Sequence, residues 1–159
     1  MFRVGIGYDA HRLVKQRDLV LGGVKVPFDK GLLGHSDADV LSHAIGDALL
    51  GCLALGDLGK LFPDTDKKYK NISSLKLLSS IGKKISQRKD SIVNVDSIVL
   101  AEKPKLWKYI DSMRQNVADA LKINKDRVSV KATTTEGMGF VGKGEGMAAY
   151  AIVLVRLGK

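Results

Sequence analysis

The chain has 159 residues, of which 45% are hydrophobic and 27% are charged, a balance that is typical of one soluble globular domain. No run of about 18 apolar residues occurs, which excludes a transmembrane helix. The formal net charge of +9 suggests nucleic acid as a class of partner. Because the lysines are dispersed and aromatic residues make up only 6% of the chain, we expect no nucleic-acid binding.

The chain begins with MFRVGIGYDAHR, which alternates as a β-strand does and lacks the charged and apolar regions of a signal peptide. The single cysteine, Cys52, lies in an apolar stretch and cannot form an internal disulfide. We therefore expect a protein of the cytoplasm, or of an organelle stroma if a transit peptide has been removed, without membrane association.

A hairpin and a long helix follow the first strand. LVLGGVKVPF reads as two short strands that turn at the Gly-Gly pair. Residues 38–55 carry a continuous helical pattern. Ser36 is the expected cap of this helix, Asp39 stands three residues later as in a capping box, and Gly56 is expected to end the helix.

The second half of the chain adds two helices, three strands and two loops. DLGKLFPDTD, residues 57–66, is predicted to be a loop. Apolar residues at helical spacing predict helices over residues 75–85 and 106–121. IVNVDSIVLAE and RVSVKA are predicted strands, TTTEGMGFVGKGEG is a Gly-rich loop, and GMAAYAIVLVRL is the final strand.

This order of elements predicts an α+β fold, a single-domain sandwich of a mixed or antiparallel sheet with helices on one face. The final strand is apolar on both faces, so both faces should be covered. A neighbouring subunit would cover the second face and make the protein a homo-oligomer. A second layer of helices is the alternative.

Two histidines and an aspartate form a candidate metal site. Asp9 and His11 are two residues apart on a strand, so their side chains project to the same side. His43 shares a helix face with Asp39 and Asp47, and Asp47 is expected to accept a hydrogen bond from the imidazole nitrogen that does not bind the metal. Three ligands with an open fourth position are typical of catalytic zinc.

Less specific interpretations of the same residues remain open. The pattern D-x-H is common, and a helical histidine one turn from an aspartate is often a surface pair. His35 precedes the helix, where the macrodipole favours an anion. The TTTE loop offers hydroxyls, backbone amides and the Glu136 carboxylate to a phosphate with its magnesium ion, or is simply a flexible hairpin loop.

Four segments, in this order, resemble the 2-C-methyl-D-erythritol 2,4-cyclodiphosphate synthase family: YDAHR, GGVKVPFDKGLLGHSDADVLSHAIGDALLG, ALGDLGKLFPDTD and VKATTTEGMGFVGKGEG. The resemblance covers essentially the whole chain, and the combination of D-x-H, HSD-x-DV-x-x-H, FPDTD and TTTE is highly specific. It implies a single catalytic domain, residues 1–159, of a phosphorus–oxygen lyase in non-mevalonate isoprenoid precursor biosynthesis. The implied reaction converts 4-diphosphocytidyl-2-C-methyl-D-erythritol 2-phosphate into 2-C-methyl-D-erythritol 2,4-cyclodiphosphate and CMP.

The resemblance also implies roles for individual residues. One Zn²⁺ per subunit is implied at Asp9, His11 and His43, and Mg²⁺ or Mn²⁺ with the substrate diphosphate at Glu136. His35 and Thr134 match positions assigned to transition-state stabilisation. The residues that match substrate contacts are Asp9, His11, His35, Ser36, Asp57, Gly59, Phe62, Pro63, Asp64, Thr65, Asp66, Ala101, Lys105, Leu106, Trp107, Ala132, Thr133, Thr134, Thr135, Glu136, Phe140 and Lys143.

The implied assembly is a homotrimer with active sites between adjacent subunits. Members of the family also carry an apolar cavity on the threefold axis that can hold an isoprenoid diphosphate. Lys143 stands where the family usually has arginine, which keeps the charge but loses bidentate phosphate geometry. A zinc-dependent hydrolase of nucleotide diphosphates is the rival enzyme, because the same metal and loop would activate water.

Overall fold

The computed structural model describes residues 1–63 and 65–158 of the chain. Its strands are β1 (Phe2–Lys15), β2 (Leu19–Leu21), β3 (Val24–Val26), β4 (Lys30–Leu32), β5 (Ser91–Leu100), β6 (Val128–Thr133) and β7 (Gly146–Arg156). Its α-helices are α1 (Val40–Cys52), α2 (Leu58–Leu61), α3 (Ser74–Gln87), α4 (Ile110–Leu121) and α5 (Gly139–Gly142). Short 3₁₀ turns cover Lys67–Tyr69 and Lys125–Arg127.

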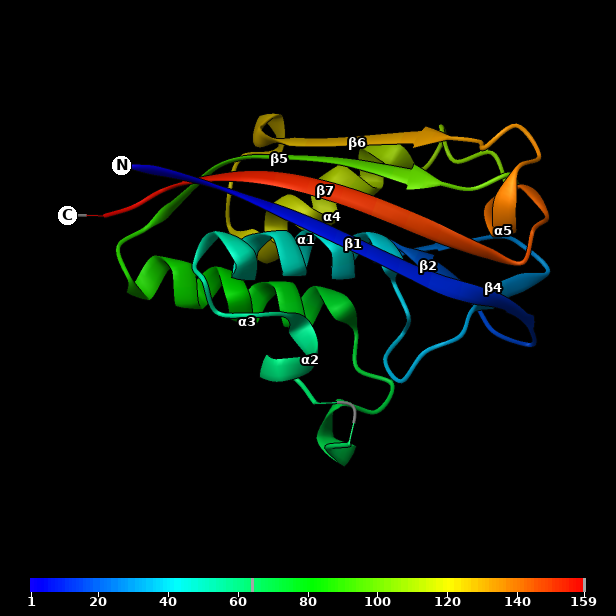
Figure 1. Ribbon diagram of the computed structural model, residues 1–159, viewed down its shortest axis with the longest axis horizontal. Helices are drawn as coiled ribbons and strands as arrows, with labels where there is room; N and C mark the ends of the chain where they lie inside the picture. The colour runs from blue at the N-terminus through cyan, green and yellow to red at the C-terminus, as the bar shows by residue number, and fades with distance from the viewer. Residues whose placement is uncertain (64, 159) are drawn as a thin grey trace.

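Within the described residues, the main sheet has five strands in the order β4-β1-β7-β5-β6 (Figure 1). β1 and β5 both run antiparallel to β7, whereas β6 runs parallel to β5. The predicted α+β class with a mixed sheet is therefore confirmed. The predicted hairpin is confirmed too, since β2 and β3 pair antiparallel and turn at Gly22 and Gly23, which both have positive φ.

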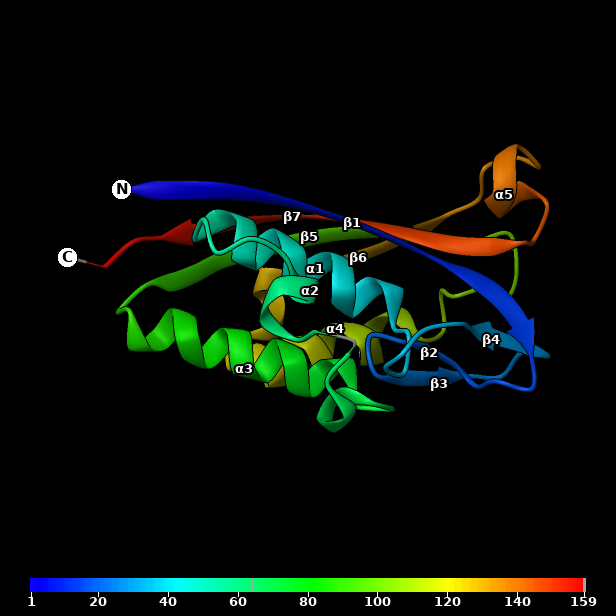
Figure 2. The same cartoon turned by 60° about the horizontal axis from the view of Figure 1, so that its bottom comes forward.

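Helices α1, α3 and α4 lie on the same side of the sheet (Figure 2). α1 approaches β1 very closely, because Gly5 and Gly7 face it. A Cβ atom on Gly5 would lie 1.9 Å from the carbonyl oxygen of Ala48, and one on Gly7 would lie 1.9 Å from that of Ala44. The absence of side chains at these glycines lets the backbone of α1 pack against β1, the strand that carries Asp9 and His11.

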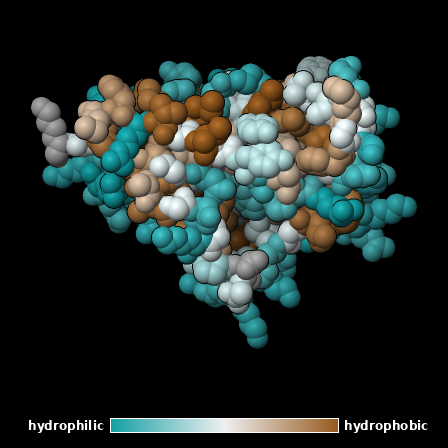
Figure 3. All heavy atoms as spheres, in the orientation of Figure 1, coloured by the Kyte–Doolittle hydropathy of each residue, from teal (hydrophilic) through white to brown (hydrophobic). Residues whose placement is uncertain are grey.

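The opposite face of the sheet carries large apolar side chains that are exposed in the single chain. Val4 and Ile6 of β1 are 68% and 67% exposed, and Ile152 of β7 is 51% exposed. The rings of Tyr8 and Tyr150 pack against each other on this face, with their centroids 4.7 Å apart and their planes tilted by 43°. Figure 3 shows apolar atoms gathered over the strands. In the part of the chain that the structure describes, no helix covers this face, so a second helical layer is not the cover.

The predicted boundaries of the first long helix are wrong at both ends. Asp39, rather than Ser36, is the N-cap, because its side chain accepts a hydrogen bond from the Ser42 N–H at 3.0 Å. The Ser36 hydroxyl instead accepts from the Ala38 N–H in the preceding turn. The helix ends at Cys52, with Leu53 as the C-cap, before it reaches Gly56.

Three other predicted segments differ in detail from the structure. The predicted loop 57–66 contains α2, and the Gly-rich loop contains α5. The helix predicted over residues 106–121 begins at Ile110. Among the described residues, no helix is both long enough and apolar enough to cross a membrane.

Candidate metal centre and active site

Three side chains from β1 and α1 converge on one point. Asp9 Oδ2 lies 2.8 Å from His11 Nε2 and 2.9 Å from His43 Nδ1. The two imidazole nitrogens are 3.1 Å apart. Because Asp9 and His11 project from the same side of β1 and α1 packs directly on that strand, the predicted ligand set is brought together as a group that could hold a metal ion.

The remaining nitrogens of the two imidazoles already have partners. His11 Nδ1 lies 2.9 Å from the carbonyl oxygen of Leu33, which can only accept, so Nδ1 carries a proton, and in the neutral imidazole Nε2 offers its lone pair to a metal ion. His43 Nε2 meets the hydroxyls of Ser74 and Ser36 at 2.9 and 3.1 Å. Outer partners of this kind orient metal-binding histidines, and a donor set of two imidazoles and one carboxylate suits zinc. The residues present therefore fit the metal that the sequence predicts.

The electrostatics of this cluster favour a cation. Burial raises the pKa of the Asp9 carboxyl, but hydrogen bonds from His11 and His43 and their positive charge lower it more, so the pKa lies well below its usual value. Burial lowers the pKa of His43, but the hydrogen bond to Asp9 and the surrounding carboxylates raise it more. A metal ion binds an imidazole nitrogen that carries no proton, so the raised pKa of His43 makes the metal affinity fall as the pH is lowered.

The cluster lies in a hollow of about 500 Å³ between β1, α1 and α2. Many residues that were predicted to bind substrate line it; they are His35, Ser36, Asp57, Gly59 and Phe62. His35 is exposed, while the carbonyl groups on either side of it are held by Arg17, which donates to Gly34 and Ser36 at 3.3 and 3.1 Å. The sequence analysis did not identify Arg17, since its contacts are with backbone atoms that no motif reveals.

The expected hydrogen bond from the His43 imidazole to the Asp47 carboxylate is not found. Asp47 lines the hollow, but its Oδ1 accepts from the Leu58 N–H at 2.8 Å and so fixes the start of α2. The partners of His43 Nε2 among the described residues are serines rather than a carboxylate. The role predicted for Asp47, to accept a hydrogen bond from His43, is therefore wrong, because sharing a helix face does not make two side chains meet.

The FPDTD segment continues from the rim of this hollow. Pro63 and Thr65 are exposed, and Asp66 accepts from the Lys68 N–H at 3.1 Å as the cap of a 3₁₀ turn. Asp64, which was also predicted to contact substrate, lies outside the described residues.

A second group of predicted residues gathers elsewhere, where β5 and β6 end and α5 begins. They are Ala101, Lys105, Leu106, Trp107, Ala132, Thr133, Thr134, Thr135, Glu136, Phe140 and Lys143. Among the described residues that line the hollow of the metal cluster, none belongs to this group. In the part of the chain that the structure describes, Phe140 alone of this group shares a hollow with a metal-cluster residue, since it lines a smaller hollow of about 270 Å³ together with His11. The other members of the group do not line the hollow of the metal cluster in one copy of the chain.

The TTTE loop is ordered by a carboxylate that the sequence analysis missed. Glu102 accepts from the N–H and the hydroxyl of Thr135 at 2.8 and 3.2 Å. Glu136 has a φ of +52°, and its carboxylate accepts a hydrogen bond from the Thr134 hydroxyl. Glu102 lies next to the predicted contact residue Ala101, but its contact with Thr135 joins residues 33 apart and no local pattern predicts it.

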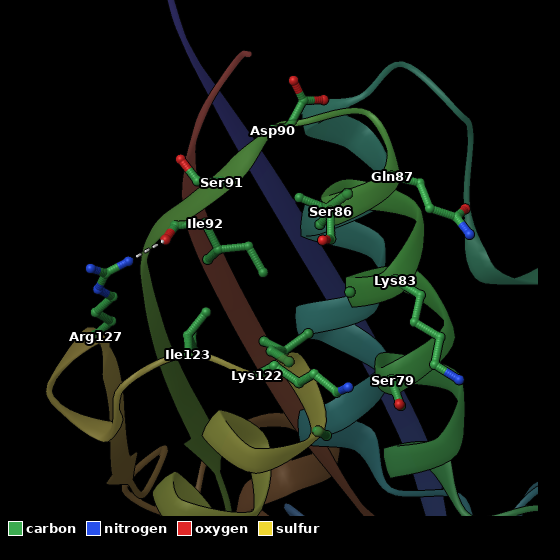
Figure 4. Close-up of a pocket in the computed structure, with 14 residues that line it drawn as sticks. Ser79, Lys83, Ser86, Gln87, Asp90, Ser91, Ile92, Lys122, Ile123 and Arg127 are labelled. Atoms are coloured by element: carbon green, nitrogen blue, oxygen red, sulfur yellow. Dashed lines mark hydrogen bonds between the residues drawn. The ribbon is translucent and has the colours of Figure 1, made fainter.

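Another hollow lies between the C-terminal ends of α3 and α4 and has a volume of about 370 Å³ (Figure 4). Lys83, Lys122 and Arg127 stand around it, and Arg127 donates to the carbonyl of Ile92 at 3.2 Å. Its lining contains neither a histidine nor any residue that was predicted to belong to the active site. None of the described residues that line it belongs to the Asp9–His11–His43 cluster.

Comparison with known proteins gives one consistent result. The model of the YgbB family matches residues 2–156. The 2-C-methyl-D-erythritol 2,4-cyclodiphosphate synthase of Lachnospira eligens is 63% identical over 150 residues, which cover 94% of this chain and 82% of that protein. The synthase of the same name from Pelotomaculum thermopropionicum is 60% identical over 153 residues, covering 96% of this chain and 94% of that protein. Among solved structures, IspF of Plasmodium falciparum in complex with CDP has a TM-score of 0.87 and 32% identity, covering 99% of this chain and 97% of that one.

Proposed function

The chain belongs to the YgbB family, whose curated members similar to it are named 2-C-methyl-D-erythritol 2,4-cyclodiphosphate synthase, and on that premise we propose that it catalyses this cyclisation. The substrate is 4-diphosphocytidyl-2-C-methyl-D-erythritol 2-phosphate. An oxygen of its 2-phosphate attacks the β-phosphorus, the bond from that phosphorus to the bridging oxygen breaks, and CMP departs with the bridging oxygen. The products are the cyclic diphosphate and CMP, as an isoprenoid precursor pathway requires.

The observation that carries this proposal is the convergence of Asp9, His11 and His43 in a hollow that His35 and Ser36 also line. Zn²⁺ held by the three ligands would supply a Lewis acid that offsets the charge of the β-phosphate. An intramolecular phosphoryl transfer needs its reacting ends held together and negative charge neutralised, with little covalent help from the protein.

Different residues of the chain then bind different parts of the substrate. His35, whose flanking carbonyls are fixed by Arg17, donates to the attacking phosphate, and Ser36 binds beside it. Asp57, Gly59 and Phe62 of the α2 region contact the erythritol portion, and the FPDTD segment extends this contact. The β5 and β6 ends and the TTTE loop bind the cytidine diphosphate portion, with Thr134 donating to the departing phosphate. The solved relative with CDP bound supports a cytidine nucleotide as ligand.

Phosphorus NMR of the purified protein with this substrate, Zn²⁺ and Mg²⁺ tests the function directly. We expect two coupled resonances of a cyclic diphosphate together with the signal of CMP. CMP accompanied by linear phosphates alone would assign the chain to the hydrolases. An unchanged spectrum from folded, zinc-loaded protein would reject the proposed reaction.

Glu136 is proposed to hold Mg²⁺ or Mn²⁺ with the substrate diphosphate, because carboxylates beside phosphate groups suit these ions. We expect Glu136→Ala to retain zinc and to lose most of the rate increase that added Mg²⁺ gives the unaltered protein. Zinc content and initial rates over a Mg²⁺ series measure the two effects separately. A normal response to Mg²⁺ in the variant would remove Glu136 from this role.

A homotrimer with active sites between subunits is also proposed. The exposed apolar face of β1 and β7 needs a cover, and Glu136 does not line the hollow of the metal cluster in one chain. A neighbouring copy that brings its Glu136 loop to the hollow of the metal cluster would complete the site. This arrangement also explains why Val4 and Ile6 point away from the helices of their own chain.

We expect sedimentation equilibrium to give the mass of three chains for the unaltered protein and a smaller mass for Ile6→Asp. The carboxylate that Ile6→Asp introduces would be buried in the apolar interface on assembly. Removing its hydration costs free energy when no hydrogen-bond donor or cation in the interface compensates it. Ser80→Asp on the exposed surface of α3 is the matched control and should leave the trimer intact. A monomer at all concentrations for the unaltered protein would contradict the proposal.

A further inference from the structure

His43 is linked to an aspartate through a serine on another helix. Its Nε2 lies 2.9 Å from Ser74 Oγ, and this hydroxyl makes a very short hydrogen bond to Asp37 Oδ1. Ser74 is the first residue of α3 and is 1% exposed, so the link is shielded from water. The backbone N–H of Ser74 also donates to the second oxygen of Asp37 at 3.0 Å.

The chemistry of the three groups gives each hydrogen bond a direction. A carboxylate is an acceptor, so the hydroxyl proton of Ser74 points to Asp37. The hydroxyl oxygen is then left to accept from His43, which requires the proton of the neutral imidazole to be on Nε2. In that neutral form, which is the form that binds a metal, Nδ1 of His43 carries a lone pair, and Nδ1 is the atom that faces Asp9 and His11.

We propose that Asp37 and Ser74 are positioning residues for the metal centre, and that they hold His43 as the Nε2–H tautomer so that Nδ1 is the ligand atom. The metal is the zinc of the proposed function, on which this inference rests. The two histidines then bind through opposite nitrogens, since His11 donates from Nδ1 to Leu33 and presents Nε2. Without the carboxylate, the Ser74 hydroxyl is free to turn and donate to Nε2, which favours the tautomer that cannot bind zinc.

A purely structural role for Asp37 is a separable alternative. Asp37 accepts the first N–H of α3, where the N-cap residue Ser73 makes no side-chain hydrogen bond, and a negative charge stabilises a helix at this end. The variant Ser74→Ala removes the link to His43 but keeps the backbone N–H that caps α3 on Asp37. It therefore tests the hydrogen-bonded link from Asp37 through Ser74 to His43 without removing the contact of Asp37 with the first N–H of α3.

We expect Ser74→Ala to bind zinc about 10-fold more weakly, at the lower end of the roughly 10- to 100-fold losses seen when such outer partners are removed. The Ser36 hydroxyl, 3.1 Å from the same nitrogen, remains as a poorer acceptor. Competition with a zinc chelator of known affinity measures the effect, and thermal unfolding of the zinc-free protein checks the fold. Ser80→Ala, which removes a serine hydroxyl bonded within α3 itself, is the matched control and should bind zinc normally.

A second measurement uses the unaltered protein and does not depend on any variant. In zinc-loaded protein with ¹⁵N-labelled histidine, we expect His43 to show a protonated Nε2 and a zinc-bound Nδ1, the reverse of His11. Zinc bound through Nε2 of His43, or an affinity of Ser74→Ala within twofold of the unaltered protein, would overturn the inference. An unaltered protein that binds no zinc would overturn it together with the metal part of the proposed function. If zinc binds with the expected ligand atoms but no cyclic product forms, the proposed reaction is refuted, and the positioning role of Asp37 and Ser74 remains supported.

Discussion

Replacing His43 with alanine is expected to abolish zinc binding and to lower kcat/KM for the cyclisation by about 10³-fold or more. The variant leaves two protein ligands on β1, Asp9 and His11, and an aspartate–histidine pair does not hold zinc tightly. His43 is largely buried, but its ring stands at the edge of an open hollow, so we expect the fold to survive. Metal analysis of the dialysed protein and the phosphorus NMR assay measure the two losses.

The matched control for this variant is His35→Ala. The chain has three histidines, and His35 is the one outside the ligand cluster. We expect His35→Ala to bind zinc normally and to lose activity for a different reason, because it would lack the proposed donor to the substrate phosphate. Retained zinc together with high activity in His43→Ala would contradict the assigned ligand set.

Replacing Asp39 with alanine is expected to cost about 3–5 kcal/mol of the free energy of unfolding. The Asp39 carboxylate is fully buried, and it accepts from the N–H groups of Gly22, Gly23 and Ser42 and from the Ser42 hydroxyl, at 2.8 to 3.0 Å. It thus joins the turn between β2 and β3 to the start of α1. Alanine would leave these buried donors without an acceptor, and each unpaired donor costs roughly 1–3 kcal/mol.

Urea unfolding at one fixed protein concentration measures this loss, since the stability of an oligomer depends on concentration. Asp18→Ala is the control, because the Asp18 side chain is 63% exposed and its ion pair with Lys25 lies at the surface. We expect that control to change the free energy of unfolding by less than about 1 kcal/mol. An equal effect of both variants would show that the buried hydrogen bonds of Asp39 are unimportant.

The aspartates in and after HSDADVLSH show which contacts the local sequence pattern could not predict. The sequence pattern correctly placed Asp39 at the start of a helix, but it assigned the cap itself to Ser36. It assigned no role to Asp37, whose partner Ser74 is 37 residues away on α3. It chose Asp47 as the partner of His43, whereas Asp47 bonds to Leu58. The errors at Asp37 and Asp47 concern contacts between segments that are separated in the sequence, whereas the cap error is a shift of a local contact.

The predictions that succeeded depended on neighbours in the chain. Alternation along a strand put Asp9 and His11 on one side, helical spacing gave α3 and α4, and the Gly-Gly pair marked the hairpin between β2 and β3. These patterns are reliable because backbone geometry alone sets the direction in which successive side chains point. The family resemblance added the ligand role of His43, which spacing alone had left open.

By itself, the sequence determined the types of the main elements, the α+β class with a mixed sheet, and the metal-ligand candidates of the first strand and helix. The tertiary structure decided that α1 packs on the two glycines of β1, which brings His43 to Asp9 and His11. It also decided that serines meet the outer nitrogen of His43 and that Glu136 does not line the hollow of the metal cluster. The physical reason is that local periodicity fixes the face on which a side chain lies, while the partner it meets depends on the packing of distant elements.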